Sequence, residues 1–294
     1  MDHRHDHDHG DAGRIGFAFF LNLSFALIEI AGGILTNSVA ILSDALHDLG
    51  DSLALALAWG LQKVSERGRD RRFTYGYRRF SLLGALINGG ILVAGSLVIL
   101  AMAIPRLLAP QPTLAVGMLV LAVFGILVNG AAVLRLKKGR SQNAKVVALH
   151  LLEDVLGWAA ILVGAVVIHF TGWYWIDPLL SLLIAIYILI SATRALLSAS
   201  RILLQGVPEG IDLSAIEARL LSVAGVVSTH DLHLWSLDGE RTILTVHLLL
   251  DTPPDPDTAC RIKAEANEAM RELGIGHCTL EIEGPGEKCA RKEH

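Results

Sequence analysis

Six long apolar stretches, separated by short polar connections, fill the chain up to residue 205. They cover residues 15–35, 39–61, 80–108, 114–134, 146–170 and 173–197. A helix that crosses a bilayer needs roughly 20 mostly apolar residues, and all six stretches reach that length. The pattern therefore predicts an α-helical membrane domain of six transmembrane helices within residues 14–205.

Beyond residue 205 the pattern changes to charged and alternating segments, typical of a soluble domain over residues 206–294. The predicted elements are a helix over 212–222, strands over 226–237 and 241–250, a helix over 257–273 and a strand over 278–283. Asp212 suits the N-cap of the first helix, Asp238-Gly239 the turn between the first two strands, and Gly274 the end of the second helix. This αββαβ order predicts a ferredoxin-like α+β domain with its helices on one face of a small sheet.

The composition agrees with a membrane protein, since 52% of the 294 residues are hydrophobic and only 18% are charged. Positive charge is concentrated in the connections after the second and fourth apolar stretches. These connections hold Lys63, Arg67, Arg69, Arg71, Arg72, Arg78 and Arg79, and Arg135, Lys137, Lys138, Arg140 and Lys145. Because basic loops stay on the cytoplasmic side, both termini and the soluble domain are predicted to be cytoplasmic. Topology explains these basic residues, so no nucleic-acid partner is predicted.

Two identical His-x-x-x-Asp pairs lie in the second and fifth apolar stretches. They are His47 with Asp51 and His150 with Asp154. Residues four apart on a helix face the same way, one turn apart, so each pair presents an imidazole and a carboxylate together. Ionisable groups in a bilayer are costly and mark candidate functional sites. Two such pairs supply the four nitrogen and oxygen ligands of a tetrahedral Zn²⁺ site.

A structural interpretation of these pairs is also open, as buried hydrogen-bonded groups that hold a helix bundle together. Finding the same pair in two separate spans favours the metal site. Imidazole and carboxylate suit Zn²⁺ and, with altered geometry, Co²⁺, Ni²⁺ or Cd²⁺. Asp44 falls on the same helical stripe as His47 and Asp51, and Asp48 lies beside it, so this stripe is expected to face protein, water or a cation.

Other polar and small residues within the spans are expected to serve helix packing. Asn22 is predicted to form an interhelical hydrogen bond, either to Asn88 or to a backbone group. For Glu29 the same role and a place in a cation or proton path are equally open. Close helix packing is predicted at Gly84, Gly89, Gly90 and Gly95.

With its paired His-x-x-x-Asp motifs in the second and fifth spans, the chain resembles the cation diffusion facilitator family of divalent-metal transporters over residues 15–283. Further matching stretches are Asn37-Ser38-Val39-Ala40-Ile41-Leu42-Ser43-Asp44, Tyr75-Gly76-Tyr77-Arg78-Arg79, Asp177-Pro178 and His230-Asp231-Leu232-His233-Leu234-Trp235. The resemblance implies that His47, Asp51, His150 and Asp154 form the transport site, with a preference for zinc. It also implies a homodimer that exchanges metal for protons by alternating access.

In the soluble domain the resemblance implies dimerisation and regulatory metal binding. The candidate ligands are His230, His247, Glu281, Glu283 and Cys289, with His233 and His277 as further histidines of the same strands. His230 and His247 match family positions that bind metal, and Glu281 and Glu283 fall where other members place ligands. The alternative is that these are strand and surface residues with no ligand role. Strand alternation is expected to turn His233 away from His230.

Residues 1–13 form a His/Asp-rich tail, expected to be cytoplasmic, in which His3, His5, His7 and His9 are candidate weak metal ligands. The three cysteines, Cys260, Cys278 and Cys289, all fall in the soluble domain, and their odd number does not indicate a disulfide framework. The short loop 137–145 lacks the His-rich insert of many eukaryotic family members, which favours a bacterial inner membrane.

The expected function is that of a divalent-cation transporter, a Zn²⁺/H⁺ antiporter exporting zinc from the cytoplasm, and not an enzyme. Zn²⁺ is expected as substrate and as regulatory ligand, with Cd²⁺, Co²⁺ or Ni²⁺ as further substrates. The alternative is an intramembrane zinc-dependent hydrolase, which needs three protein ligands, an open water position and a general base. Glu153 or Asp48 is a candidate base, but no His-Glu-x-x-His motif is present.

Overall fold

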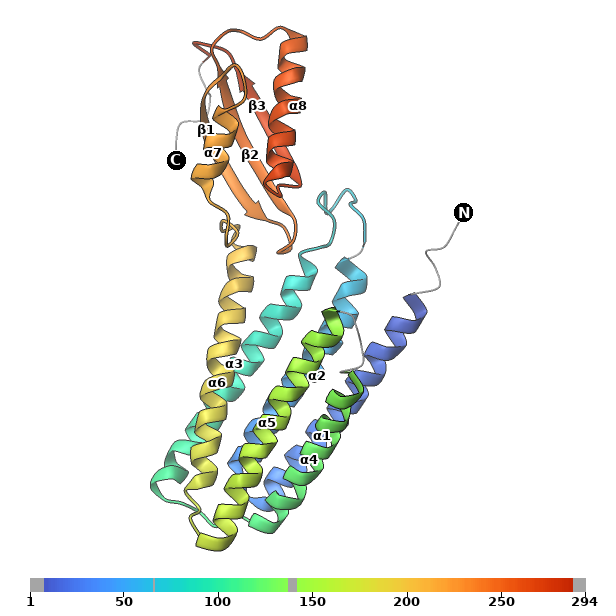
Figure 1. Ribbon diagram of the computed structural model, residues 1–294, viewed down its shortest axis with the longest axis vertical. Coiled ribbons are helices and arrows are strands. Elements are labelled where there is room, and N and C mark those ends of the chain that lie inside the picture. Colours follow the sequence, from blue (N-terminus) through green and yellow to red (C-terminus); the bar gives the residue numbers. More distant parts are fainter. Residues whose placement is uncertain (1–7, 66, 137–141, 288–294) are drawn as a thin grey trace. The chain divides into compact units, whose positions relative to one another are not determined.

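The computed structural model describes residues 8–65, 67–136 and 142–287 (Figure 1). Its six long helices are α1 (Asp8–Thr36), α2 (Val39–Ser65), α3 (Phe80–Leu108), α4 (Ala115–Leu136), α5 (Gln142–Thr171) and α6 (Ile176–Leu203). They are followed by α7 (Leu213–Leu221), β1 (Val226–Ser236), β2 (Thr242–Leu250), α8 (Pro256–Glu272) and β3 (His277–Glu283). The chain divides into two compact units, Met1–Lys63 with Gly84–Leu196 and Val64–Leu83 with Leu197–His294.

Each predicted helix and strand is present, and the αββαβ order is confirmed. Three of the described helices contain a stretch long and apolar enough to cross a membrane, namely Phe80–Leu108, Leu152–Thr171 and Ile176–Leu203. Helix α2 carries three carboxylates within its apolar sequence, and these lower its hydropathy. The six-span arrangement therefore stays a prediction.

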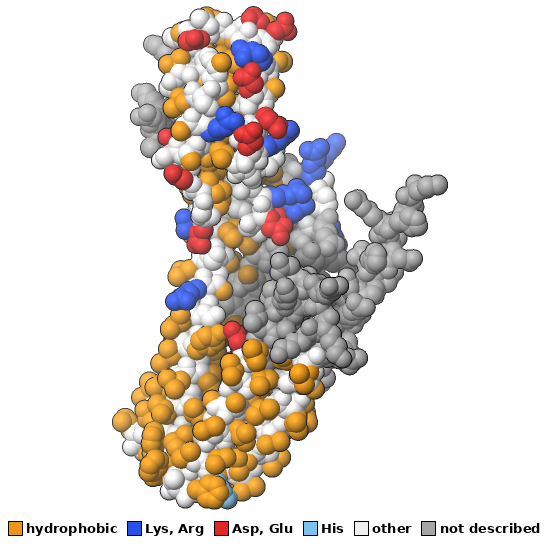
Figure 2. Space-filling view, viewed as in Figure 1, with side chains coloured by type: hydrophobic (Ala, Val, Ile, Leu, Met, Phe, Trp, Pro, Cys, Tyr) orange, Lys and Arg blue, Asp and Glu red, His pale blue; other side chains and the backbone are white. Residues whose placement is uncertain are grey.

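The surface of the first unit is apolar where it is exposed. Large hydrophobic side chains such as Ile34, Leu127 and Val163 are each more than 60% exposed. Figure 2 shows hydrophobic side chains over the visible face of this unit, whereas the charged side chains gather on the other unit. An apolar surface of this extent suits a lipid environment, because soluble monomers rarely expose large apolar patches.

Glycines bring the helices of the first unit close together. A Cβ added to Gly95 would lie 2.6 Å from the Leu46 side chain, and one added to Gly89 would lie 3.4 Å from Leu196. A Cβ added to Gly84 would lie 3.3 Å from the Leu61 side chain of α2. The prediction is wrong for Gly90, where an added Cβ would have no described atom within 4 Å.

Asp177, at the start of α6, caps the beginning of α2. Its carboxylate accepts hydrogen bonds from the Ser38 hydroxyl (2.5 Å) and from the backbone N–H groups of Val39 (2.9 Å) and Ala40 (3.3 Å). The first N–H groups of a helix have no partner within the helix, and a carboxylate also interacts favourably with the helix dipole. The fully buried Asp177 thus ties two helices that are far apart in the sequence.

The second unit contains a three-stranded sheet in the order β1-β2-β3, with β1 and β2 antiparallel and β2 and β3 parallel. Alternate residues of β2, Leu244, Val246 and Leu248, pack in one core with residues of both α7 and α8. The helices therefore cover one face of the sheet. Asp212 caps α7 as predicted, and Gly274 follows α8 with a left-handed φ of +79°.

Replacing Asp177 with alanine is expected to lower the melting temperature of the full-length protein in detergent by several degrees. The change leaves the hydroxyl of Ser38 and two backbone N–H groups without their buried acceptor, and each hydrogen bond to a charged group contributes about 1.5–3 kcal/mol. Ser24→Ala is the matched control, because the exposed Ser24 donates only to Phe20 of its own helix. Equal melting temperatures for the two variants would contradict this role of Asp177.

Candidate metal centres

Three residues of the predicted transport site converge between α2 and α5. The His47 Nε2 atom lies 3.8 Å from Oδ2 of Asp51, one helical turn away, and 4.0 Å from Oδ1 of Asp154. The side chain of Asp154 is 9% exposed, and those of His47 and Asp51 are about one quarter exposed. His150 lies one turn before Asp154 in α5, but its side chain is outside the described residues. The geometry joins an imidazole and two carboxylates from two helices.

Further buried carboxylates surround this group. Glu29, Asp44 and Asp48 are 1%, 6% and 5% exposed, and Glu29 interacts electrostatically with both aspartates and with Asp154. Asp44 faces α5, because a Cβ added to Gly157 would lie 3.5 Å from Oδ1 of Asp44. So many buried carboxylates are costly in a low dielectric unless they are protonated or close to a cation.

Asn22 links α1 to this part of α2. Its amide donates hydrogen bonds to the backbone oxygen of Asp48 (3.0 Å) and to the hydroxyl of Ser52 (3.1 Å). The predicted interhelical hydrogen bond of Asn22 to a backbone group is therefore confirmed, and its partner lies in α2. The link fixes the turn of α2 that follows His47.

A second cluster lies on the sheet face opposite the helices, with one residue from each strand. His230 of β1 is paired across the strands with His247 of β2, and their ring centroids are 5.1 Å apart. Glu283 of β3 contacts both, with 2.7 Å from its Oε1 to Nδ1 of His247 and 3.2 Å from its Oε2 to Nε2 of His230. Ligand atoms of the three residues all lie within 4.8 Å of one another, close enough to hold one metal ion.

Two more carboxylates border this cluster. Nε2 of His247 lies 3.2 Å from Oε2 of Glu281 and 3.4 Å from Oδ2 of Asp231. Asp231 was not predicted as a candidate ligand. Its φ of +49° is unusual for a residue with a side chain, and it lies where the β1–β2 register shifts between His230 and His233. A positive φ next to candidate ligands is characteristic of a functional position.

The same register shift corrects the expectation for His233. His230 pairs with His247 and His233 pairs with Thr245, so two residues of β1 lie opposite the single residue Val246 of β2. A β-bulge of this kind puts His233 on the same face as His230, contrary to simple alternation. The exposed His233 ring contacts Asp231, with Nε2 3.0 Å from Oδ1.

Other candidates of the soluble domain lie apart from the cluster. His277 is at the opposite end of β3 and packs its ring edge-on against Tyr75. The Cys278 side chain packs toward the hydrophobic core, and burial raises the pKa of its thiol to about 11. The candidates His3, His5, His7 and Cys289 lie outside the described residues, as does the side chain of His9.

Comparison with known proteins identifies the class of this chain. Residues 15–204 match the family model of the cation efflux transmembrane domain, and residues 208–284 match that of the cation efflux protein cytoplasmic domain. The protein is therefore an integral membrane protein with a soluble domain of helices and a small sheet. It belongs to the cation efflux, or cation diffusion facilitator, family, which confirms the resemblance noted from its motifs.

Several bacterial relatives match almost the whole chain. The metal cation efflux system protein CzcD of Cupriavidus metallidurans is 35% identical, over 99% of this chain and 93% of its own. The cadmium, cobalt and zinc/H(+)-K(+) antiporter of Bacillus subtilis is 33% identical, over 95% and 91%. The zinc transporter ZitB of Escherichia coli is 32% identical, over 96% and 93%.

Replacing both His230 and His247 with alanine is expected to remove one Zn²⁺ site per protomer from the full-length protein. Loss of a hydrogen-bond partner behind a metal ligand already weakens binding by about 10–100-fold, and loss of two ligands has a larger effect. Equilibrium dialysis in detergent measures the bound zinc. His277→Ala is the matched control from the same sheet face, and an equal loss in this variant would contradict the assignment.

Proposed function

We propose that the protein is a divalent-cation transporter that exports Zn²⁺ from the cytoplasm in exchange for protons. The observation that carries the proposal is the convergence of His47, Asp51 and Asp154 from two helices of an integral membrane domain. The names of the relatives, which include zinc transport and proton antiport, support it. They also favour transport over the alternative of a hydrolase.

The transported ion would be held by these three residues together with His150, which is the fourth proposed ligand. Two neutral imidazoles and two carboxylates match the four-coordinate preference of Zn²⁺, and they also suit Cd²⁺ and Co²⁺. The Cupriavidus and Bacillus relatives, named for metal cation efflux and for cadmium, cobalt and zinc transport, agree with this range. Ni²⁺ has the same ligand chemistry.

Proton exchange follows from the ligand chemistry. Imidazole binds metal only in its neutral form, so metal binding and protonation compete. Histidine is also the side chain whose charge changes nearest neutral pH. A site open to a more acidic exterior would take up protons and release Zn²⁺, and a site open to the cytoplasm would lose them and bind Zn²⁺. The buried carboxylates of α1 and α2 are further places where a proton could balance the charge.

The proposed topology has six spans and both termini in the cytoplasm of a bacterial inner membrane. Its parts are the tail 1–13, the transport domain 14–205 and a ferredoxin-like domain 206–294. Support comes from the six long helices, the basic connections after α2 and α4, and the bacterial relatives. Lipid surrounds the apolar surface of the helices.

In the soluble domain, His230, His247 and Glu283 are proposed to bind regulatory Zn²⁺, with Glu281 beside them. The short distances among these side chains support this role. We propose a homodimer in which the metal-bearing sheet face takes part. Cys289 and the tail histidines, His3, His5, His7 and His9, remain proposed additional ligands.

Asp51→Ala and Asp154→Ala are each expected to abolish Zn²⁺ flux in proteoliposomes while the protein stays folded. Each change removes one ligand and leaves the other charged groups unbalanced in a low dielectric. Glu153→Gln is the matched control, because Glu153 is exposed and adjacent to Asp154 in the sequence. Wild-type flux in both alanine variants would refute the site, whereas loss in Glu153→Gln alone would move it to another face of α5.

His47→Asp is expected to keep part of the flux and to shift selectivity from Zn²⁺ toward Cd²⁺. The substitution exchanges a nitrogen ligand for an oxygen ligand and adds a negative charge, which changes both ligand type and geometry. The ratio of initial Zn²⁺ and Cd²⁺ fluxes measures the shift. An unchanged ratio with active protein would place selectivity outside this residue.

A further inference from the structure

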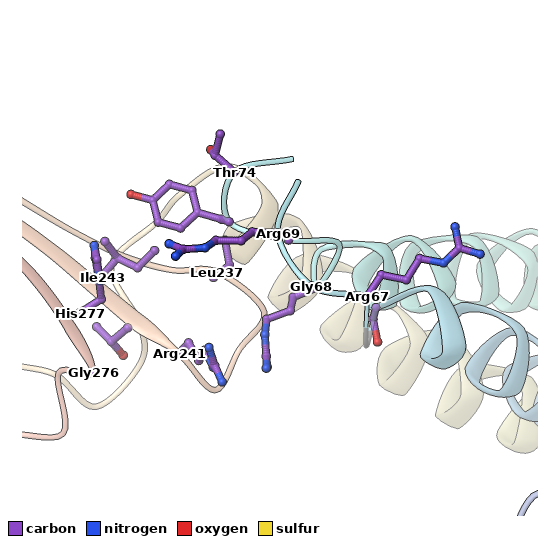
Figure 3. Close-up of a pocket in the computed structure, with 14 residues that line it drawn as sticks. Arg67, Gly68, Arg69, Thr74, Leu237, Arg241, Ile243, Gly276 and His277 are labelled. Atoms are coloured by element: carbon purple, nitrogen blue, oxygen red, sulfur yellow. The ribbon is translucent and has the colours of Figure 1, made fainter. Parts of the chain in front are cut away.

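A basic cavity lies in the second unit, where the loop that follows α2 meets the turn between β1 and β2. Its volume is about 670 Å³. Figure 3 shows the loop residues Arg67, Gly68, Arg69 and Thr74 on one side and residues of the β1–β2 turn, of β2 and of the start of β3 on the other. None of these residues takes part in either metal centre.

The charged side chains that line the cavity among the described residues are all basic. These residues are Arg67, Arg69, Arg78, Arg241 and His277, and no described Asp or Glu is among them. In the part of the chain that the structure describes, Arg78 has a carboxylate partner, since it lies 3.3 Å from Asp238. No described carboxylate forms an ion pair with Arg69 or Arg241, so their charges are available to a ligand.

Two acidic side chains next to lining residues in the sequence, Asp70 and Asp238, stabilise the turns of the cavity wall. Asp70 accepts hydrogen bonds from the backbone N–H groups of Phe73 and Arg72 and from the Tyr77 hydroxyl, and these bonds lower its pKa. Asp238 accepts from the backbone N–H groups of Glu240 and Arg241 in the hairpin turn. Both carboxylates thus hold the turns in place, and neither forms an ion pair with Arg69 in the described structure.

The cavity has room for a ligand beside the arginines. Buried Leu237 of the β1–β2 turn and Ile243 of β2 line it, while Figure 3 shows the Arg69 side chain extending from the loop toward Ile243 and His277. A Cβ added to Gly276 would meet nothing within 4 Å, so the backbone there is open to a ligand. Hydroxyls of Thr74 and Tyr75 add hydrogen-bond donors.

A basic loop next to a membrane helix is expected from topology alone, so loop charge by itself indicates no ligand. Two features go further. The arginines line one cavity, and Arg241, at the end of the β1–β2 turn, is far from the loop in the sequence. Arginine is well suited to phosphate, because its planar guanidinium donates paired hydrogen bonds to two oxygens.

From this arrangement we infer that the cavity is a phosphate-binding site, occupied by the phosphate of an anionic phospholipid headgroup or by soluble inorganic phosphate. Arg69 and Arg241 bind the phosphate oxygens, with His277 beside them. The loop connects two helices of a membrane domain, so lipid headgroups are expected close to the ends of the loop. Basic pockets at such positions bind anionic headgroups in other membrane proteins.

The test uses the full-length protein with Arg69→Gln combined with Arg241→Gln. Arg71→Gln combined with Arg72→Gln is the matched control, because these exposed arginines lie on the same loop and do not line the cavity. The melting temperature is titrated in one arm with phosphatidylglycerol against phosphatidylcholine in mixed micelles. The second arm uses inorganic phosphate against chloride at equal ionic strength.

Wild-type protein is expected to be stabilised in at least one arm, with about 30-fold weaker apparent binding in the cavity variant. The control is expected to bind as wild type does. A response to phosphatidylglycerol alone identifies the headgroup as the ligand, and a response to phosphate identifies the soluble anion. Equal weakening in both double variants, or no response of the wild type in either arm, overturns the proposal. Arg69→Lys combined with Arg241→Lys should retain most of the binding, which separates lost charge from lost folding.

Discussion

The burial of carboxylates among apolar helices is the constraint on which the membrane unit depends. Glu29, Asp44, Asp48 and Asp154 come from three helices and are each at most 9% exposed. Charges in a low dielectric must be protonated, paired or bound to a cation. The proton or metal that enters this region therefore changes the forces among α1, α2 and α5. In the proposed transport cycle, this dependence links occupancy of the site to movement of the helices.

In the soluble domain, the alternation of side chains along a strand separates the candidate ligands from the hydrophobic core. Alternate residues of β2, namely Leu244, Val246 and Leu248, lie in the core beneath α7 and α8. His247 therefore lies on the opposite face. There Glu283 contacts both histidines of the cluster. Both candidate centres thus combine imidazole and carboxylate groups, and for such groups metal binding and protonation compete.

Local features were predictable from the sequence, and long-range ones were not. Apolar length and periodicity identified all eleven elements, and Asp212 was recognisable as an N-cap because capping involves only neighbouring residues. The cap that Asp177 provides to α2 is a tertiary contact between segments that are distant in the sequence, so no local pattern predicts it. The bulge at Asp231 likewise depends on pairing with β2, and it changes which face His233 occupies. The candidate ligands in the helices were found from residue type and spacing, and those of the soluble domain from the family resemblance, but their convergence required the fold.

The most direct test is zinc movement in proteoliposomes that contain a Zn²⁺ indicator and a pH indicator in the same lumen. With an acidic lumen and Zn²⁺ added outside, this account predicts that Zn²⁺ entry raises the luminal pH as protons leave. Collapse of the pH gradient should slow the entry of Zn²⁺. Zinc entry that leaves luminal pH unchanged and ignores the gradient, or the absence of any zinc entry, would contradict exchange of metal for protons at the His47, Asp51 and Asp154 site.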